Sequence, residues 1–361
     1  MTRMNLMEKV FSVTLQNGKV TNVYFSQDIK DLSHQLGTYG NNALWVFDTN
    51  TAPLFRNLPL NRVVLESGEK NKNWKSIERI ISTALDLRLA RDSVFIAFGG
   101  GVVCDMTALA SSLYMRGTRL VLVPTTLLSM VDAAVGGKTA IDYAGAKNLI
   151  GTFHPAEDVL IAADTLRTLS ESEYVSGLGE VLKHALLSED TELYDFLVKN
   201  RDAVLARQRD VLSQMVRLSI AVKNSYIERD PEERKGIRSA LNLGHTFAHA
   251  LEAVNHFTGL SHGKAVAWGC GRALDVSHAL GLIDDEFYNK GVKLFGMYPF
   301  DMAYRVGRGE WLEFQEALAK DKKRMAGSVK FVLLEGQGKP VLRPLDMKTV
   351  QSAVIVSPRT R

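Results

Sequence analysis

Phe98-Gly99-Gly100-Gly101-Val102-Val103-Cys104-Asp105 is a glycine-rich segment between an apolar, strand-like run, Ser93–Phe98, and a helical pattern, Met106–Tyr114. Three glycines at a strand-to-helix turn let the backbone approach a phosphate closely and leave amide donors and the helix N-terminus facing the anion. The order of the residues differs from G-x-G-x-x-G, the usual dinucleotide-binding fingerprint. Taken alone, the segment predicts an α/β domain, and it fits both an anion-binding turn and an ordinary tight turn.

The same change from strand to helix recurs along the first half of the chain. Further strand-like runs of β-branched and apolar residues are Ala43–Phe47, Arg62–Leu65, Arg119–Val123 and Asp158–Ala162. Among them, Trp74–Leu87 has a helical pattern with its apolar residues on one side. Alternation of this kind predicts a parallel, doubly wound sheet.

After about Ser170 the pattern becomes mostly helical. Amphipathic helices are predicted over Glu173–Leu187, Glu192–Leu197, Arg209–Ile227, Ser239–His256 and Ala265–Leu280. Val329–Leu334 and Pro340–Leu342 predict a small hairpin. We therefore expect an α/β N-terminal domain, residues 1–170, and a mostly α-helical C-terminal domain, residues 171–361, with a small-molecule site in the cleft between them.

Composition narrows the class of protein. The chain has 361 residues, which is enough for two domains, and its net charge of +4 is too small to predict nucleic-acid binding. Two cysteines, Cys104 and Cys270, cannot build a disulfide framework and indicate a reducing compartment. The N-terminus lacks the apolar region of a secretory signal, and no apolar run approaches the ~20 residues of a membrane span. We expect a cytoplasmic protein with neither nucleic acid nor membrane as a partner.

A second segment, Pro124–Gly151, combines lysines with glycine turns. Lys138 and Lys147 supply point charges, and neighbouring glycines let backbone amides converge on oxygen atoms, as an anion-binding loop requires. Gly136–Thr139 is similar to the end of a phosphate-binding P-loop. Asp132, however, occupies the position of the upstream glycine that a P-loop requires, so an ATPase is excluded.

Histidines and a carboxylate in the helical half predict a metal site. Asn242, His245 and His249 fall on one face of a predicted helix, and His262 follows shortly after it. Glu180 lies on another predicted helix, with a lysine three residues later on the same face. Catalytic zinc sites often use two histidines and one carboxylate and leave a position open for water or substrate. Spacing alone does not identify the third ligand.

The chain resembles the 3-dehydroquinate synthase family of sugar phosphate cyclases over most of its length. The matching segments are Ser67–Lys72, Gly99–Gly101, Tyr114–Gly117, Pro124–Gly151, Gly177–Lys183, Arg238–His249, His262-Gly263 and Asp321–Lys323. Several are long, follow a fixed order and are rarely met together. The resemblance implies a dehydroquinate synthase-like fold, in which a Rossmann-like α/β domain, residues 1–170, binds NAD and a helical domain, residues 171–361, binds the metal and the substrate.

The resemblance also assigns residues to the two cofactors. It makes Glu180, His245 and His262 the ligands of Zn2+, with Co2+ as an alternative metal, and it places His249 on the substrate or phosphate side. The residues that it assigns to NAD are Asp48, Asn50, Glu69, Lys72, Gly100, Gly101, Val102, Asp105, Thr125, Thr126, Lys138 and Lys147.

A further set of residues resembles the substrate-binding residues of the family. It consists of Asp132, Lys138, Lys147, Asn148, Lys183, Lys223, Arg238, Asn242 and one lysine of the Lys322-Lys323 pair. Lys138, Asn148 and Arg116 would hold the phosphate, and Arg238 would bind a carboxylate, since its planar guanidinium can bind two oxygens. The resemblance implies that Arg116 reaches the substrate from a neighbouring subunit and that the protein is a homodimer.

The implied reaction converts 3-deoxy-D-arabino-heptulosonate 7-phosphate to 3-dehydroquinate and phosphate, as in the shikimate pathway. A substrate hydroxyl, polarised by the metal, is transiently oxidised by NAD, and phosphate is then eliminated. Hydride is returned to the substrate, and ring opening followed by an intramolecular aldol addition closes the carbocycle. NAD is thus recycled in each turnover, and the enzyme is a lyase.

Other functions stay open at this point. Another sugar phosphate cyclase could make 2-deoxy-scyllo-inosose, 2-epi-5-epi-valiolone or amino-dehydroquinate, although Arg238 and Asn242 favour a substrate with a carboxylate, which amino-dehydroquinate formation also satisfies. A metal-dependent alcohol or glycerol dehydrogenase would consume NAD stoichiometrically and release no phosphate. A non-catalytic binding protein is disfavoured, because the lysines, the carboxylate and the histidines occur together.

Three residues depart from the family pattern. Cys104 and Ala108 stand where the family often has glycine, and they could narrow the cofactor loop. Lys264 follows His262-Gly263 where an acidic or neutral residue is more usual. We expect its side chain to point into solvent, because lysines mostly lie at surfaces.

Overall fold

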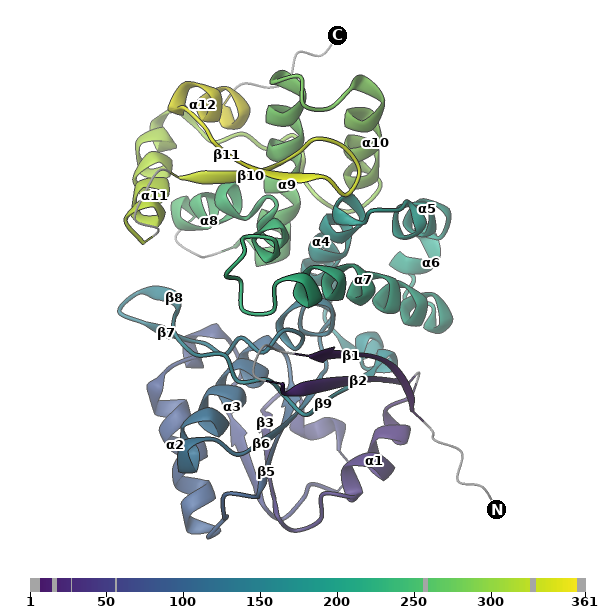
Figure 1. Ribbon diagram of the computed structural model, residues 1–361, viewed down its shortest axis with the longest axis vertical. Coiled ribbons are helices and arrows are strands. Elements are labelled where there is room, and N and C mark those ends of the chain that lie inside the picture. The colour runs from purple at the N-terminus through teal and green to yellow at the C-terminus, as the bar shows by residue number, and fades with distance from the viewer. Residues whose placement is uncertain are drawn as a thin grey trace. The chain divides into compact units, whose positions relative to one another are not determined.

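The computed structural model describes residues 7–14, 18–26, 28–55, 57–255, 259–324 and 329–355, without the side chains of residues 33–35 and 320–324. The chain divides into two compact units, Met1–Leu169 with Arg207–Ile220, and Ser170–Ala206 with Ala221–Arg361. The division falls inside helix α7, Arg209–Arg229, so this helix contributes to both units (Figure 1). The assignment of NAD to residues 1–170, and of the metal and substrate to residues 171–361, stays a prediction.

The first unit contains a seven-stranded sheet with the order β1-β2-β9-β6-β5-β3-β4. Its strands are β1 Glu8–Thr14, β2 Val20–Ser26, β3 Ala43–Asp48, β4 Arg62–Leu65, β5 Val94–Gly99, β6 Arg119–Pro124 and β9 Asp158–Ala162. Neighbouring strands are parallel except β1 and β2, which are antiparallel. The predicted α/β fold is confirmed, and the strands that the sequence predicted, β3, β4, β5, β6 and β9, are parallel. The antiparallel edge strand β1 and its neighbour β2 were not predicted. The connection from β1 to β2 is too short to cross over, so it can join only antiparallel strands.

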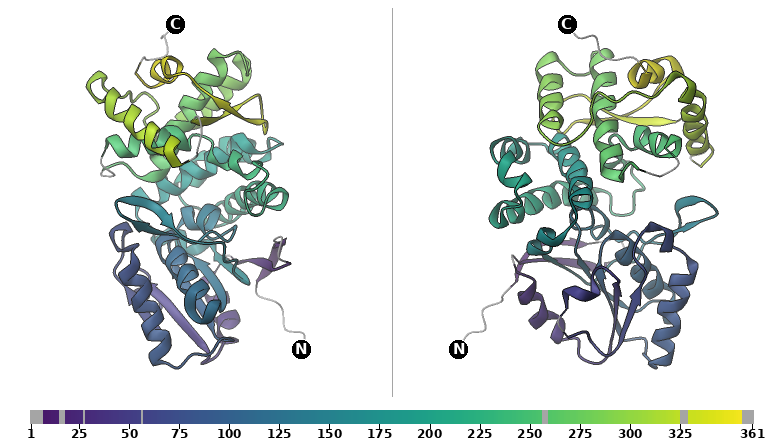
Figure 2. Two further views of the ribbon diagram at one scale, coloured as in Figure 1. Left: turned by 60° about the vertical axis from the view of Figure 1, so that its left-hand side comes forward. Right: turned by 180° about the vertical axis from the view of Figure 1, so that it is seen from behind.

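Helices cover both faces of this sheet (Figure 1, Figure 2). On one face, Leu32 of α1, Ile29–Gly37, belongs to the same buried cluster as Ile96 of β5. Side chains alternate along a strand, so Phe95 faces the other side, where its ring lies 5.6 Å from that of Tyr114. There α3, Gly101–Leu113, packs on β5 with α2, Trp74–Asp86, beside it. Burial on both faces explains why these strands are continuous apolar runs.

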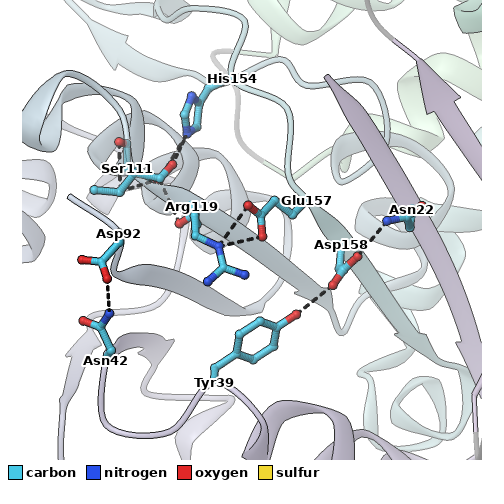
Figure 3. A network of polar contacts seen from close by, with 10 residues as sticks. Asn22, Tyr39, Asn42, Asp92, Ser111, Arg119, His154, Glu157 and Asp158 are labelled. Atoms are coloured by element: carbon cyan, nitrogen blue, oxygen red, sulfur yellow. Dashed lines mark hydrogen bonds and ion pairs between the residues drawn. The ribbon is translucent and has the colours of Figure 1, made fainter. Parts of the chain in front are cut away.

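A buried histidine anchors the loop that precedes the β7–β8 hairpin, Ile141–Tyr143 and Ala146–Ile150. The His154 Nε2 lies 3.2 Å from the Ser111 Oγ (Figure 3). It also lies 3.1 Å from the Thr118 carbonyl oxygen. Its backbone N–H donates to the Gly137 carbonyl at 2.8 Å. Burial lowers the pKa of this histidine, so the neutral ring is favoured. The end of α3 thus holds the glycine turn beside Lys138 in place.

The second unit consists of helices and one hairpin. Its elements are α4 Glu171–Leu187, α5 Glu192–Lys199, α6 Arg201–Leu205, α8 His245–Val254, α9 His262–Ala279, α10 Asp285–Gly296, α11 Trp311–Arg324, β10 Lys330–Leu334, β11 Pro340–Pro344 and α12 Met347–Ile355. The mostly helical character and the hairpin agree with the prediction. None of the helices in the described part of the chain combines the length and the apolar character that crossing a membrane requires.

One predicted helix, Ser239–His256, is wrong. Residues Arg238–Asn242 form a 3-10 turn, and α8 begins only at His245, because Gly244 between them has a left-handed backbone with φ 78°. Asn242 therefore does not share a helical face with the two histidines of α8. His256 lies outside the described residues.

Helix α9 contacts both α4 and α8 at points where only glycine fits. A Cβ atom on Gly263 would lie 1.6 Å from the Ser176 carbonyl oxygen, and one on Gly179 would lie 2.1 Å from the Gly263 carbonyl oxygen. A Cβ atom on Gly269 would lie 2.2 Å from the Gly244 carbonyl oxygen. In each case the obstacle is backbone, which cannot rotate away. The three helices are therefore fixed against one another by direct backbone contact.

Replacing Gly263 by alanine should force α4 and α9 apart. Overpacking of this kind costs about 1–3 kcal/mol, so we expect Gly263→Ala to lower Tm by about 3–10 °C in thermal unfolding. Gly296, the last residue of α10, is the matched control, since no atom lies within 4 Å of a Cβ atom placed there. Gly296→Ala should leave Tm unchanged or raise it slightly. Equal Tm values for the two variants would contradict the close contact.

Candidate functional site

Glu180, His245 and His262 come together from three helices. Glu180 lies within α4, and the two histidines are the first residues of α8 and α9. Both Nε2 atoms approach the same carboxylate oxygen, Oε1, at 3.5 Å for His245 and 3.7 Å for His262. Bonds of about 2.0–2.2 Å at tetrahedral angles place two ligand atoms about 3.4 Å apart, so this spacing fits a zinc ion.

The second nitrogen of each imidazole also has a suitable partner. The Nδ1 of His245 lies 3.2 Å from the Leu243 carbonyl oxygen, and the Nδ1 of His262 lies 3.2 Å from the Glu252 Oε1. A neutral imidazole carries one N–H, and a carbonyl or carboxylate oxygen can only accept it. The network therefore assigns the proton to Nδ1 in both rings, which leaves the Nε2 lone pairs directed at Glu180, as metal binding requires.

The carboxylate of Glu180 is completely buried in a helix that is buried nearly all round. The Lys183 Nζ forms an ion pair with its Oε2. Within the described residues, neither carboxylate oxygen accepts a hydrogen bond of standard geometry. Buried carboxylates are normally paired, hydrogen-bonded or bound to a metal. A cation between Glu180 and the two histidines would complete its surroundings, and a fourth coordination position would remain for water or substrate.

Several predicted substrate residues lie in the same unit. Lys183 and Lys223 are buried, at 1% and 4% exposure, and Arg238 is buried with its Nη1 donating to the Pro231 carbonyl oxygen at 2.6 Å. His249 is exposed, one turn along α8, and its ring lies 5.6 Å from that of His245. Asn242 is exposed in the turn before α8, and the side chains of Lys322 and Lys323 lie outside the described residues.

A residue that the sequence analysis missed also belongs to this cluster. Glu252 lies on α8, seven residues after His245, and is buried at 3% exposure. Its carboxylate accepts from His262 as described above. The signal in the sequence that could have revealed Glu252 was a charged residue on the apolar side of an amphipathic helix.

In the first unit, Lys72 joins residues from both predicted sets. Its Nζ lies 2.6 Å from the Asp105 Oδ2 and donates to the Asn148 Oδ1 at 2.5 Å, with Glu69 at 3.9 Å. The Asn148 backbone N–H donates to Asp142, whose own N–H donates to the Lys72 carbonyl. Asn148, on the β7–β8 hairpin, is thereby fixed beside the predicted NAD residues.

The same pair has shifted pKa values. Burial raises the pKa of Asp105 to about 6, although Lys72 opposes the shift. Burial also lowers the pKa of Lys72, but the neighbouring Asp105 and Glu69 outweigh this effect and raise it above its usual range. The negative charge of Asp132 also raises the pKa of Asp105, so these two carboxylates are close enough to repel each other.

The glycine-rich turn has the predicted form. Gly100 is the N-cap of α3, which begins at Gly101, and a Cβ atom on Gly100 would lie 3.0 Å from the Thr126 Cγ2. The Thr125 backbone N–H donates to the Gly99 carbonyl oxygen, and the Thr126 hydroxyl donates a hydrogen bond to the Ser129 Oγ. Val102 is half-buried in the first turn of the helix. A helix N-terminus lined by glycine and threonine is suited to an anion.

Other predicted residues lie around this unit. The Asp48 carboxylate accepts the backbone N–H groups of exposed Asn50 and of Thr51, so it stabilises its own turn. Lys138 lies in the loop before the hairpin, in an isolated bridge to Phe153, and Lys147 is exposed on the hairpin. Arg116 is exposed with φ 64°, in a left-handed turn.

The unusual residues cause little disturbance. Cys104 is buried, and burial raises the pKa of its thiol, so it is not a reactive thiolate. It donates to the Gly99 carbonyl oxygen at 3.7 Å. Ala108 is buried within α3 without distorting the helix. Lys264 is half-buried in the first turn of α9, so part of it is exposed to solvent, and the direction of its side chain stays a prediction.

Comparison with solved structures supports the fold. A 2-epi-5-epi-valiolone synthase from Streptomyces hygroscopicus subsp. jinggangensis 5008, bound to NAD+ and Zn2+, has a TM-score of 0.81 at 24% identity and covers 92% of this chain and 94% of its own. A 2-deoxy-scyllo-inosose synthase, bound to carbaglucose-6-phosphate, NAD+ and Co2+, has a TM-score of 0.82 at 20% identity and covers 98% and 100%. A probable glycerol dehydrogenase from Sinorhizobium meliloti 1021 scores 0.63 at 16% identity, covering 91% and 94%.

Sequence comparison is more specific. The family descriptions "3-dehydroquinate synthase N-terminal" and "3-dehydroquinate synthase C-terminal" match residues 62–176 and 177–324. A 3-dehydroquinate synthase from Francisella tularensis subsp. tularensis (strain WY96-3418) is 38% identical over 86% of this chain and 89% of its own. One from Acidithiobacillus ferrooxidans (strain ATCC 53993 / BNL-5-31) is 39% identical over 82% and 83%. Both halves of the sequence thus match the same family, and the chain belongs to the 3-dehydroquinate synthase family.

Proposed function

We propose that this enzyme converts 3-deoxy-D-arabino-heptulosonate 7-phosphate to 3-dehydroquinate and phosphate, with NAD and Zn2+ as cofactors. The observation that carries the proposal is the convergence of Glu180, His245 and His262, whose donor atoms lie within 4.8 Å of one another. Curated relatives that are 38% identical over 86% of the chain are 3-dehydroquinate synthases. Relatives of known structure bind NAD+ with Zn2+ or Co2+.

In the second unit, which holds the proposed metal ligands, we assign the buried lysine and arginine side chains to the substrate. When bound, the metal polarises a substrate hydroxyl and NAD accepts and returns its hydride. Lys183 and Lys223 are buried, so their charges act on substrate oxygens in a medium of low dielectric constant. Arg238 is held by the Pro231 carbonyl oxygen, and we assign its planar guanidinium to the substrate carboxylate. Asn242 and His249, both exposed, complete this set.

In the first unit, we assign residues to NAD and to the substrate phosphate. The turn at Gly100 and Gly101 offers backbone amides at a helix N-terminus, and we assign it to the NAD pyrophosphate. Lys138, Lys147 and Asn148 supply charge and an amide for the substrate phosphate. The remaining predicted NAD contacts are Asp48, Asn50, Glu69, Lys72, Val102, Asp105, Thr125 and Thr126, with Asp132 on the substrate side.

Phosphate release is the direct test of this function. The purified enzyme with the heptulosonate phosphate, catalytic NAD and Zn2+ should release phosphate and form 3-dehydroquinate. A chelator should abolish the activity, and Zn2+ or Co2+ should restore it. His245→Ala should lower kcat/KM by at least about 100-fold, because polarisation by a metal contributes several kcal/mol. Turnover of sedoheptulose 7-phosphate or glucose 6-phosphate instead would indicate another cyclase, and stoichiometric NAD reduction without phosphate release would indicate a dehydrogenase.

The Lys72–Asp105 pair predicts a pH-dependent stability. An Asp105 pKa of about 6 in the folded state exceeds the unfolded value of 3.8, so this group reduces stability as pH rises through about 6. Without Lys72 the pKa of Asp105 in the folded state should rise further, and the loss of stability should continue to higher pH. The Tm gap between wild type and Lys72→Met should therefore widen from about pH 5 to about pH 8. Lys75→Met, at an exposed site on α2, should show no widening; a constant gap for Lys72→Met would refute the coupling.

We further propose that Arg116 serves the active site of a partner subunit in a homodimer. Arg116→Ala and His245→Ala should each be inactive alone. If the enzyme is a dimer and Arg116 acts across it, a mixed dimer contains one intact site, so random mixing should restore about one quarter of wild-type activity. Light scattering checks that dimers form. Mixed dimers without activity would show that Arg116 acts within its own subunit.

A further inference from the structure

We infer that Glu252 is a positioning residue, which holds the His262 imidazole in the tautomer and orientation that bind the metal. This inference rests on the metal site proposed above. The contact is between the Glu252 Oε1 and the His262 Nδ1, at 3.2 Å, on the side of the ring away from Glu180. Glu252 itself would not bind the metal.

The helix geometry explains how Glu252 reaches this position. His245 and Glu252 are seven residues apart on α8, which is two turns, so both project from one face of the helix. The same face therefore supplies one proposed ligand and the partner of another. Glu252 is buried at 3% exposure between Leu251 and Val254, which are also buried. Burying a carboxylate among apolar side chains is costly unless it is paired, and His262 is a partner of this one.

The two proposed histidine ligands are not held equally. The Nδ1 of His245 faces a neutral carbonyl, that of Leu243, whereas the Nδ1 of His262 faces a carboxylate. A carboxylate partner raises the basicity of the imidazole more than a carbonyl does, and it orients the ring more strongly. His262 is also the more exposed ring, at 30% compared with 13% for His245. The ring with less packing around it thus has the stronger partner.

A competing explanation is a second metal site. One donor atom from each of His249, Glu252 and His262 lies within 4.8 Å of the others. His262 would then have to bind two cations through its two nitrogens, which requires loss of the Nδ1 proton. A hydrogen bond at 3.2 Å needs no such deprotonation, so we favour the positioning role.

Metal affinity separates these roles better than activity does. Zn2+ affinity would be measured by competition with a chromophoric chelator, and the visible spectrum of the Co2+-loaded protein would report ligand geometry. Glu252→Leu should weaken Zn2+ binding by about 10–100-fold and alter the Co2+ spectrum. Glu252→Gln should weaken it less, because its amide oxygen can still accept the Nδ1 proton. Thermal unfolding of each metal-free variant shows whether it folds.

Ser176→Ala is the matched control. The Ser176 Oγ accepts the Gly263 backbone N–H at 3.1 Å, so this variant disturbs the residue next to His262 and leaves the partner of its ring intact. We expect a lower Tm with unchanged Zn2+ affinity. If Ser176→Ala weakens Zn2+ binding as much as Glu252→Leu does, Glu252 has only a structural role and the inference is wrong.

The remaining outcomes separate this inference from the proposed function. If His245→Ala loses Zn2+ and Glu252→Leu binds it like wild type, only the positioning role fails. If wild type and His245→Ala bind Zn2+ equally, the proposed metal site fails as well. A second Zn2+ equivalent in wild type that both His249→Ala and Glu252→Leu lose would assign Glu252 as a ligand and overturn the positioning role.

Discussion

Backbone contact between helices is the constraint on which the metal-binding half of this protein depends. Gly263 and Gly179 bring α9 against α4, and Gly269 brings α9 against Gly244, the residue before α8. Each proposed metal ligand is a direct neighbour of one of these glycines in the sequence. A helix separation set by backbone atoms is stiffer than one set by side chains, which can change rotamer. The ligand positions are thus fixed by the same contacts that fix the helices.

The second consequence is electrostatic. Helix α4 is buried on nearly all sides, so Glu180 and Lys183 are removed from water together. A buried ion pair is weak evidence for stability, because the cost of desolvation offsets the attraction between the charges. A role in the proposed reaction explains these buried charges better than a role in stabilising the fold does. The same reasoning applies to Glu252. The second unit buries charge where the proposed reaction would need it.

The sequence predicted the elements better than the contacts between them. Strand runs such as Ser93–Phe98 are visible because burial on both faces produces continuous apolar sequence. The helix over Ser239–His256 was wrong because apolar periodicity continues through Gly244, and periodicity carries no information on the sign of φ. The ligand set came from family resemblance, since Glu180 is remote in sequence from the histidines. Glu252 was missed because its burial depends on how α8 and α9 meet.

The first unit shows why residues assigned to different ligands cannot be treated as independent. Lys72 contacts Asp105, on the helix after the glycine turn, and Asn148, on the hairpin assigned to phosphate. Asp142 completes this network, because its backbone N–H donates to the Lys72 carbonyl and its carboxylate accepts the Asn148 backbone N–H. A ligand that draws the Lys72 ammonium away from Asp105 would also weaken its bond to Asn148, because one ammonium serves both. The helix after the glycine turn and the hairpin are therefore linked through a single buried charge.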